Sequence, residues 1–189
     1  MERSVIFAGF GGQGLLFAGQ ALARGALEDG LEVFWIPSYG PEMRGGTASC
    51  TVIVGDEPIG SPVVDRFDAA VAMNLPSLEK YGPRVASGGL LIVNASLVEE
   101  TARRPDIDEL HVACTELAGE AGDDKLVSVV ALGALLGRLD WVRSDAMETA
   151  LREIVGKKRP AALASDLAAF ALGLAVGRGE RLEVAAASR

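Results

Sequence analysis

Short apolar runs alternate along the chain with longer segments in which apolar residues recur at helical spacing. The short runs are typical of buried strands, and the longer segments are typical of helices that cover a sheet. We expect strands over residues 4–8, 32–36, 47–54, 69–73, 88–94 and 109–114. We expect helices over residues 14–27, 76–86, 128–139, 144–154 and 161–173. This alternation predicts an α/β fold in which helices pack on a sheet.

Glycine, proline and hydroxyl residues suggest where several of these elements begin and end. Gly30 is placed to close the first helix, Pro37 to end the second strand, and Thr115 to cap a short helix. Ser144 and Pro160 are plausible starts of later helices. These boundaries fit a single three-layer Rossmann-like domain with a helical C-terminal third.

The second and third expected strands are too close in sequence for a parallel crossover, so we expect them to pair antiparallel. The sheet is therefore predicted to be mixed but mostly parallel. We assign the domain to residues 1–177, and we expect the Arg- and Ala-rich tail over residues 178–189 to fray.

The stretch FAGFGGQGLLFAGQALA, residues 7–23, places a glycine-rich turn between the first strand and the first helix. Gly9, Gly11 and Gly14 match the G-x-G-x-x-G pattern that brings a pyrophosphate to a helix N-terminus. A dinucleotide site also requires an acidic residue at the end of the second strand, but Glu32 lies at its start. A dinucleotide turn, a tight turn without a ligand, and a backbone surface that meets another subunit's cofactor all stay open.

A second irregular segment, PSYGPEMRGGT at residues 37–47, lies between two expected strands. Its glycines allow the backbone to fold around a ligand or a partner, and Arg44 adds a positive charge suited to a carboxylate or a phosphate. The alternative is a surface ion pair of Arg44 with Glu42, Asp56 or Glu57.

The formal net charge of −8 and the pI of about 4.7 argue against a nucleic-acid interface, which would need a basic face. Cys50 and Cys114 form no C-x-x-C pair, so we expect no zinc site and no iron–sulfur cluster from this chain alone. Reduced cysteines indicate a cytoplasmic protein. The N-terminus lacks the layout of a signal peptide, and no stretch is expected to reach the length of a membrane helix.

No catalytic residue is assigned. His111 has no nucleophile motif near it and is interpreted as a structural histidine, and Cys50 is interpreted as a core thiol. Trp35 and Trp141 are interpreted as core or interface anchors. The chain thus has shaped, glycine-rich loops without chemical groups of its own, which is typical of a subunit that completes a site elsewhere.

Four stretches resemble the gamma subunit of 2-oxoacid:ferredoxin oxidoreductases, most of all the 2-oxoglutarate type. They are GFGGQG at 9–14, PSYGPEMRGGTASCTVIV at 37–54, EPIGSPVV at 57–64 and AMNLPSLEKY at 72–81. The resemblance extends from about residue 5 to residue 173. The family commonly has asparagines near Ser128 and Asp166, where this chain departs.

The resemblance implies an enzyme that decarboxylates a 2-oxoacid on thiamine diphosphate, transfers the acyl group to coenzyme A and passes electrons through Fe–S clusters to ferredoxin. Alpha and beta subunits would hold thiamine diphosphate and Mg²⁺, and a ferredoxin-like delta subunit would often hold clusters. This chain would bind none of these groups by itself, would be inactive alone, and would contact neither nucleic acid nor membrane.

Within the resemblance, 2-oxoisovalerate, pyruvate and indolepyruvate are alternative substrates. A stand-alone nucleotide-binding dehydrogenase and a self-associating structural module are alternative functions. Both loops are expected to contact a subunit or a ligand through Gly9, Gly11, Gly12, Gln13 and Gly14, and through Ser38, Tyr39, Gly40, Glu42, Met43, Arg44, Gly45, Gly46 and Thr47.

Overall fold

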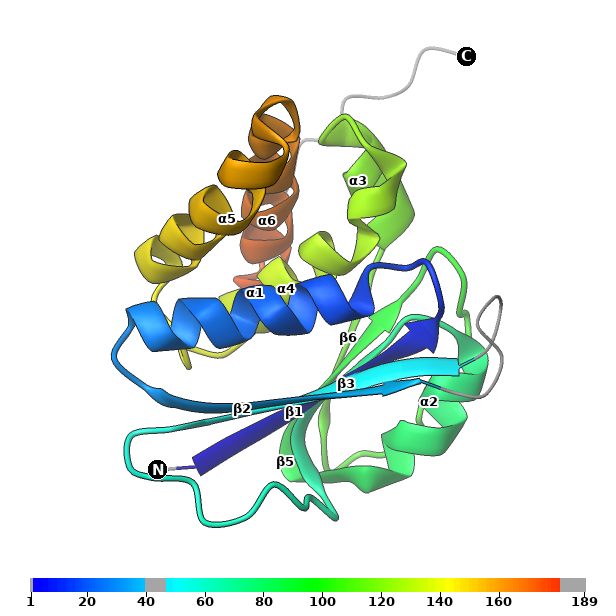
Figure 1. Cartoon of the computed structure of the whole chain (residues 1–189). Helices are drawn as coiled ribbons and strands as arrows, with labels where there is room; N and C mark the ends of the chain where they lie inside the picture. Colours follow the sequence, from blue (N-terminus) through cyan, green and yellow to red (C-terminus); the bar gives the residue numbers. More distant parts are fainter. Residues whose placement is uncertain (1, 40–46, 181–189) are drawn as a thin grey trace, which may run out of the picture.

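The computed structural model describes residues 2–39 and 47–180, which form a six-stranded sheet with helices on both faces (Figure 1). The strands are β1 (Glu2–Phe10), β2 (Glu32–Tyr39), β3 (Thr47–Gly55), β4 (Phe67–Ala72), β5 (Val85–Asn94) and β6 (Asp108–Val112). Their order across the sheet is β2-β3-β1-β4-β5-β6. β3 is antiparallel to β1 and β2, whereas β1, β4, β5 and β6 are parallel. The predicted α/β class and mixed, mostly parallel sheet are confirmed.

The helices are α1 (Leu15–Glu28), α2 (Leu75–Tyr81), α3 (Cys114–Glu120), α4 (Val127–Arg138), α5 (Ser144–Lys158) and α6 (Leu163–Gly177). Short 3-10 turns cover Gly82–Arg84, Asp124–Leu126 and Pro160–Ala162. Figure 1 shows α2 on one face of the sheet and the other helices on the opposite face. Alternate residues of β1 therefore enter different cores: Phe7 packs in the larger helical layer, and Ile6 packs on the side of α2.

β3 takes an unexpected place, because it is inserted between β2 and β1. The antiparallel β2–β3 pair was predicted, but β3 also pairs with β1 along its whole length, with Phe10 opposite Thr47. β2 therefore becomes the outer strand of the sheet, and it continues through Pro37 to Tyr39. The expected end at Pro37 is wrong, because an edge strand tolerates a missing N–H on its open side.

Two further boundaries differ from expectation. The helix expected to reach residue 86 ends at Tyr81, because Val85 already pairs with Phe67 as the start of β5. Thr115 lies inside α3 and does not cap it, and Ala113 holds the N-cap position. Ser144, in contrast, is the first residue of α5 as predicted, and Pro160 begins the 3-10 turn before α6.

The backbones of α4 and α6 touch directly through glycines. A Cβ atom on Gly173 would lie 2.0 Å from the carbonyl oxygen of Val130, and one on Gly133 would lie 2.3 Å from an α6 carbonyl oxygen. Gly137 and Gly177 make the same kind of contact one turn further along. Because no side chain separates the two helices here, the position of α4 is fixed by the position of α6.

The segment Pro160–Gly177 is long and apolar enough to span a membrane by length and composition, with a mean hydropathy of 1.6. The expectation that no stretch reaches this length was therefore wrong. Only 28% of this segment is buried, although its glycine face packs on α4 as the face of a core helix does. Core helices of globular proteins also meet the criterion, so it is weak evidence for a membrane span.

Gly173→Ala is expected to lower the free energy of unfolding by about 1–3 kcal/mol, because the added methyl group overlaps the Val130 carbonyl oxygen. Urea unfolding measures the change. Gly156→Ala in α5 is the matched control, since the nearest atom to its new Cβ would be a Leu163 methyl carbon at 3.6 Å. That variant should gain up to about 1 kcal/mol from helix propensity. Equal losses in both variants would contradict the glycine contact.

Candidate functional site

The glycine-rich turn at the C-terminal end of β1 is held closed by the side chain of Gln13. The Gln13 Oε1 atom accepts a hydrogen bond from the Phe10 backbone N–H at 2.7 Å, and Gln13 Nε2 donates to the Met73 carbonyl at 3.5 Å. A Cβ atom on Gly9 would lie 2.3 Å from Gln13 Oε1, so glycine at this position makes room for that side chain. Gln13 thus links the end of β1 to the end of β4.

This link crosses the place where an open α/β sheet usually binds a ligand. From β1 the chain leads through α1 to β2 on one side of the sheet, and β4 lies on the other side. Ligands of such sheets bind in the crevice at this switch point, outside the carboxyl ends of the strands. In this chain the Gln13 side chain reaches from β1 to Met73 across that crevice. Gln13, predicted as a contact residue, is therefore also a structural tether.

Gly14 connects the turn to α1 and to α4. It is the N-cap of α1 in the left-handed region, with φ of 76°, where glycine is favoured. Its carbonyl accepts hydrogen bonds from the Ala18 N–H and from Ser128 Oγ, both at 3.0 Å. A Cβ atom on Gly14 would lie 2.6 Å from Ser128 Oγ. Ser128, noticed in the sequence only as a departure from the family, is thus a direct support of the turn.

A hollow of about 270 Å³ opens beside this turn, lined by Phe10, Gly11, Gly12, Gly14, Leu15, Leu16, Phe17 and Ala48. Among the described residues no side chain caps the first turn of α1, which also carries no acidic residue, so its N–H groups remain available as donors. The lining side chains are apolar, and Phe10 is 38% exposed. Such a surface suits burial against another protein chain better than it suits a solvated pyrophosphate.

The second loop begins and ends at the end of the sheet that carries the glycine-rich turn. β2 ends at Tyr39 and β3 begins at Thr47, which lies opposite Phe10. Ser38 and Thr47 are exposed there. The two loops follow β1 and β2, which β3 separates in the sheet. The loops still lie at the same end of the sheet, because β3 runs antiparallel and starts where β1 ends.

Some of the predicted contact residues fall outside the described part of the chain. These are Gly40, Glu42, Met43, Arg44, Gly45 and Gly46, together with the side chain of Tyr39. Their role in contacting a subunit or a ligand remains a prediction.

Comparison with known proteins places the chain in a family. Residues 4–176 match the family described as pyruvate ferredoxin/flavodoxin oxidoreductase. The chain belongs to this family. The resemblance to the gamma subunits of 2-oxoacid:ferredoxin oxidoreductases is thereby confirmed.

Individual relatives agree with this placement. The 2-oxoglutarate synthase subunit KorC of Methanocaldococcus jannaschii is 34% identical, over 94% of this chain and 95% of KorC. The ketoisovalerate oxidoreductase subunit VorA of Methanothermobacter marburgensis is 38% identical over 71% of this chain, but the match spans only 28% of VorA. The crystal structure of the keto/oxoacid ferredoxin oxidoreductase gamma subunit from Geobacter sulfurreducens superposes with a TM-score of 0.80 at 28% identity, covering 94% of this chain and 99% of that one.

The two cysteines of the chain are buried, and its single histidine lies beside a carboxylate. Burial raises the pKa of the Cys50 and Cys114 thiols to about 12, which keeps both neutral. Cys50 Sγ donates to the Leu15 carbonyl at 3.2 Å. His111 Nε2 lies 2.9 Å from a carboxylate oxygen of Glu109. The interpretation of Cys50 as a core thiol and of His111 as a structural histidine agrees with this geometry. Within residues 2–39 and 47–180, no three His, Cys, Asp or Glu side chains gather into a metal site.

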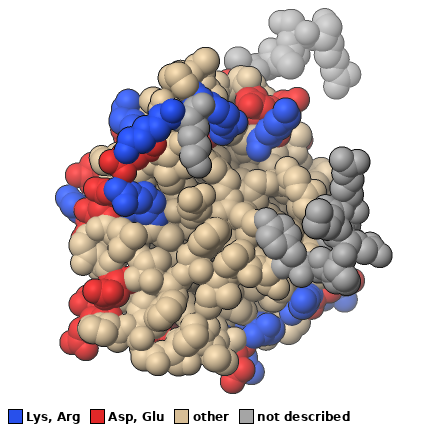
Figure 2. Space-filling model, in the orientation of Figure 1, with Lys and Arg blue, Asp and Glu red and all other residues tan. Residues whose placement is uncertain are grey.

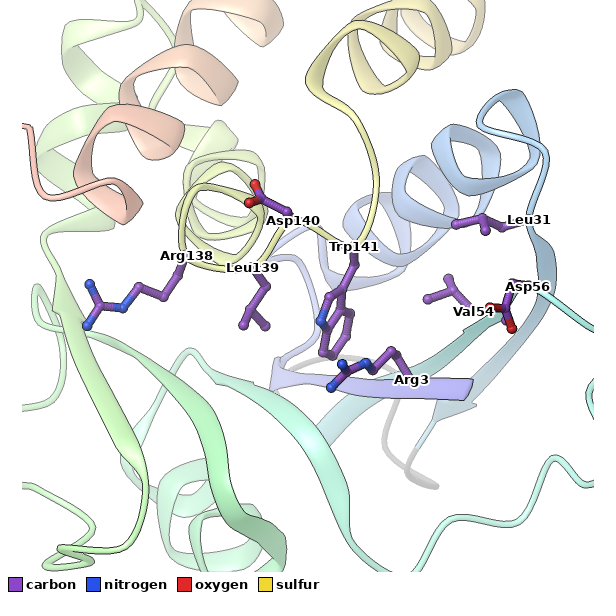
Figure 3. A pocket seen from close by; sticks show the side chains of 9 residues that line it. Arg3, Leu31, Val54, Asp56, Arg138, Leu139, Asp140 and Trp141 are labelled. Carbon is purple, nitrogen blue, oxygen red and sulfur yellow. The ribbon is translucent and has the colours of Figure 1, made fainter. Parts of the chain in front are cut away.

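A second hollow of about 400 Å³ lies at the opposite edge of the sheet, near the start of β1 (Figure 3). Trp141 descends into it from the α4–α5 connection, and the Arg3 guanidinium carbon lies 5.9 Å from the centre of the indole ring. Arg138 turns toward β6, where its Nε lies 2.5 Å from a carboxylate oxygen of Asp108. This hollow is separated from both loops by the length of β1.

Asp166 is the least expected polar group near the start of α4. It is 0% exposed in the first turn of α6, and neither carboxylate oxygen has a hydrogen-bond partner among the described residues. Burial raises the pKa of this carboxyl, Arg159 opposes that rise, and Asp123 adds to it. A neutral amide at this position would avoid the cost of ionising a buried carboxyl.

Gln13→Ala is expected to lower the free energy of unfolding by about 1 kcal/mol and to speed hydrogen exchange at the Phe10 amide, because that N–H loses its acceptor. Urea unfolding and amide exchange measure the two effects. The matched control is Gln20→Ala on the exposed face of α1. An unchanged Phe10 exchange rate in Gln13→Ala would show that the tether does not hold the turn.

Asp166→Asn is expected to stabilise the protein at neutral pH. A carboxyl with a raised folded-state pKa stabilises the fold fully below its unfolded value of about 3.8, and this contribution is lost as the pH rises through the folded-state pKa. The wild type should therefore lose stability relative to the variant from about pH 4 upward. Urea unfolding between about pH 3 and pH 7 measures the difference. With the exposed Asp140→Asn as a control, a pH-independent difference for both variants would refute the burial of an ionisable Asp166.

Proposed function

We propose that this chain is the gamma subunit of a 2-oxoglutarate:ferredoxin oxidoreductase. The observation that carries the proposal is the match to the 2-oxoglutarate synthase subunit KorC over nearly the full length of both chains. In such a complex the chain shapes a reaction centre whose chemical groups come from other subunits. The complex would work in the cytoplasm.

The chemistry of this chain is compatible with a division of labour among several subunits. Its two thiols are neutral and buried, and its single histidine is paired with Glu109. As the resemblance to the gamma subunits implies, we propose that alpha and beta subunits hold thiamine diphosphate and Mg²⁺, and that partners including a ferredoxin-like delta subunit hold Fe–S clusters. Coenzyme A is the co-substrate, and ferredoxin accepts the electrons.

The two loops at the carboxyl edge of β1 form the proposed contact surface. The apolar hollow beside Gly11 and Gly12 would be buried against a partner subunit, with Phe10 and Phe17 supplying contact area. The N–H groups in the first turn of α1 would donate hydrogen bonds to a carbonyl or carboxylate oxygen of that partner. Arg44 in the second loop would face an anionic group, either the 2-oxoacid carboxylate or a coenzyme A phosphate.

The relatives also support a second substrate class. The 38% identity to a ketoisovalerate oxidoreductase subunit favours 2-oxoisovalerate as the alternative to 2-oxoglutarate, with pyruvate and indolepyruvate as further candidates. A stand-alone dehydrogenase is disfavoured because Gln13 spans the crevice in which a dinucleotide would lie. It is further disfavoured because the exposed C-terminal end of β2, Pro37–Ser38, carries no carboxylate for a ribose.

Ferredoxin reduction should require this chain together with its alpha and beta subunits. We expect turnover with 2-oxoglutarate and coenzyme A in the assembled complex, and none from the chain alone or from the complex that lacks it. The same assay with 2-oxoisovalerate, pyruvate and indolepyruvate ranks the substrates by kcat/KM. Turnover by the isolated chain, or full activity without it, would refute the proposal.

Arg44→Ala in the complex extends this test to the second loop. Loss of a charge-assisted contact of about 1.5–3 kcal/mol predicts a rise of about ten- to hundredfold in the KM of the 2-oxoacid or of coenzyme A, and Arg44→Lys should recover part of it. If assembly and both KM values are unchanged in Arg44→Ala, Arg44 does not bind an anionic group. Thermal stabilisation of the isolated chain by NAD or FAD would instead favour a dehydrogenase.

A further inference from the structure

The open edge of the sheet can be assigned residue by residue from the hydrogen bonds of the inner strands. The Ala8 carbonyl accepts from the Met73 N–H at 2.9 Å, so the backbone groups of Ala8 face β4. Those of the next residue back, Phe7, therefore face β3, where Phe7 lies opposite Cys50. The backbone groups of Cys50 consequently point toward β1 and away from β2.

Pro37 lies opposite Cys50 on the other side of β3 and receives no ladder bond from it. The backbone of Pro37 therefore faces the open edge of the sheet. Val33 and Trp35 lie four and two residues before Pro37, so their backbone groups face the same way. The proline removes one N–H from this edge and leaves the N–H and C=O groups of Val33 and Trp35 directed outward.

Apolar side chains stand on both faces of this open strand. Trp35 is 37% exposed and packs on α1, where a Cβ on Gly19 would lie 3.0 Å from its Nε1. Phe34 is 42% exposed and projects from the opposite face together with Ile36. Figure 2 shows Lys, Arg, Asp and Glu gathered mainly toward the rim of this face, with a largely uncharged surface over its middle. An edge strand with exposed aromatic side chains, whose one charged residue, Glu32, stands at its start, is a template for strand pairing.

We propose that β2 pairs antiparallel with β2 of a second copy of this chain, with the twofold axis at Trp35. Two backbone hydrogen bonds then join the two Trp35 residues, and one joins each Val33 N–H to the Pro37 carbonyl of the other copy. Because Pro37 only accepts in this register, its missing N–H does not prevent the pairing.

The side chains select this register. With the axis at Trp35, each Phe34 lies opposite Ile36 of the second copy, and each Glu32 lies opposite Ser38. An axis at Phe34 would set Glu32 against Ile36, and an axis at Ile36 would set Phe34 against Ser38. Only the register centred on Trp35 matches apolar with apolar and polar with polar side chains.

This self-complementarity is the reason to choose a second copy as the occupant. An unrelated extended segment could also pair with this strand. With a second copy of β2, however, the twofold symmetry forms the Phe34–Ile36 pair twice. The contact is made by the outer strand β2, whereas the two loops lie at the carboxyl ends of β1 and β2. It therefore does not depend on the proposed function.

Sedimentation equilibrium of the full chain from about 1 to about 300 µM tests the proposal. The wild type should form dimers, and Phe34→Lys should raise the dimer dissociation constant at least about tenfold, because each introduced charge faces Ile36. The double variant Phe34→Lys/Ile36→Glu should restore the dimer, since each introduced lysine then faces an introduced glutamate. Leu97→Lys, at a leucine that is 58% exposed elsewhere on the surface, is the control and should leave the dimer unchanged.

Circular dichroism and thermal unfolding confirm that each variant is folded. A wild type that stays monomeric at every concentration would overturn the proposal, and so would a dimer that is unaffected by Phe34→Lys. A folded double variant that dimerises no better than Phe34→Lys would overturn the register. Loss of 2-oxoacid turnover is not a readout here, so a failure of this test is distinct from a failure of the proposed function.

Discussion

The direct backbone contact between α4 and α6 is the constraint on which the candidate site depends. Gly133 and Gly173 allow the two helices to meet without side chains between them, and this fixes where α4 begins. The start of α4 carries Ser128, whose hydroxyl holds the Gly14 carbonyl. A helix pair in the last third of the chain thereby positions a turn formed by its first fifteen residues.

The glycine-rich turn shows how one sequence pattern can serve a different chemistry. In a dinucleotide site the glycines leave space for a pyrophosphate. Here Gly9 leaves space for Gln13, which fills the crevice between β1 and β4 with a side chain of the same protein. The surface left beside the turn is apolar, and its polar groups are backbone N–H donors. This combination suits a subunit that forms the wall of a reaction centre and leaves the reacting groups to its neighbours.

The insertion of β3 determines which parts of the sheet are exposed. Because β3 runs antiparallel between β1 and β2, the loops that follow β1 and β2 reach the same edge. The same insertion moves β2 to the outside of the sheet, where Phe34 and Trp35 are exposed. The outer strand and the ends of β1 and β2 are different parts of the sheet, although Ser38 belongs to both.

The sequence by itself determined the α/β class, the glycine-rich turn and the antiparallel β2–β3 pair, because hydrophobic periodicity and short connections are local signals. The motifs around residues 9–14 and 37–54 also carried the family resemblance, although six contact residues of the second loop lie outside the described structure. Only the tertiary structure decided that β3 lies between β1 and β2, that β2 extends through Pro37, and that Ser128 supports Gly14. Each of these depends on a pairing between residues far apart in the chain, and a strand or a serine has the same local pattern whichever distant partner it meets.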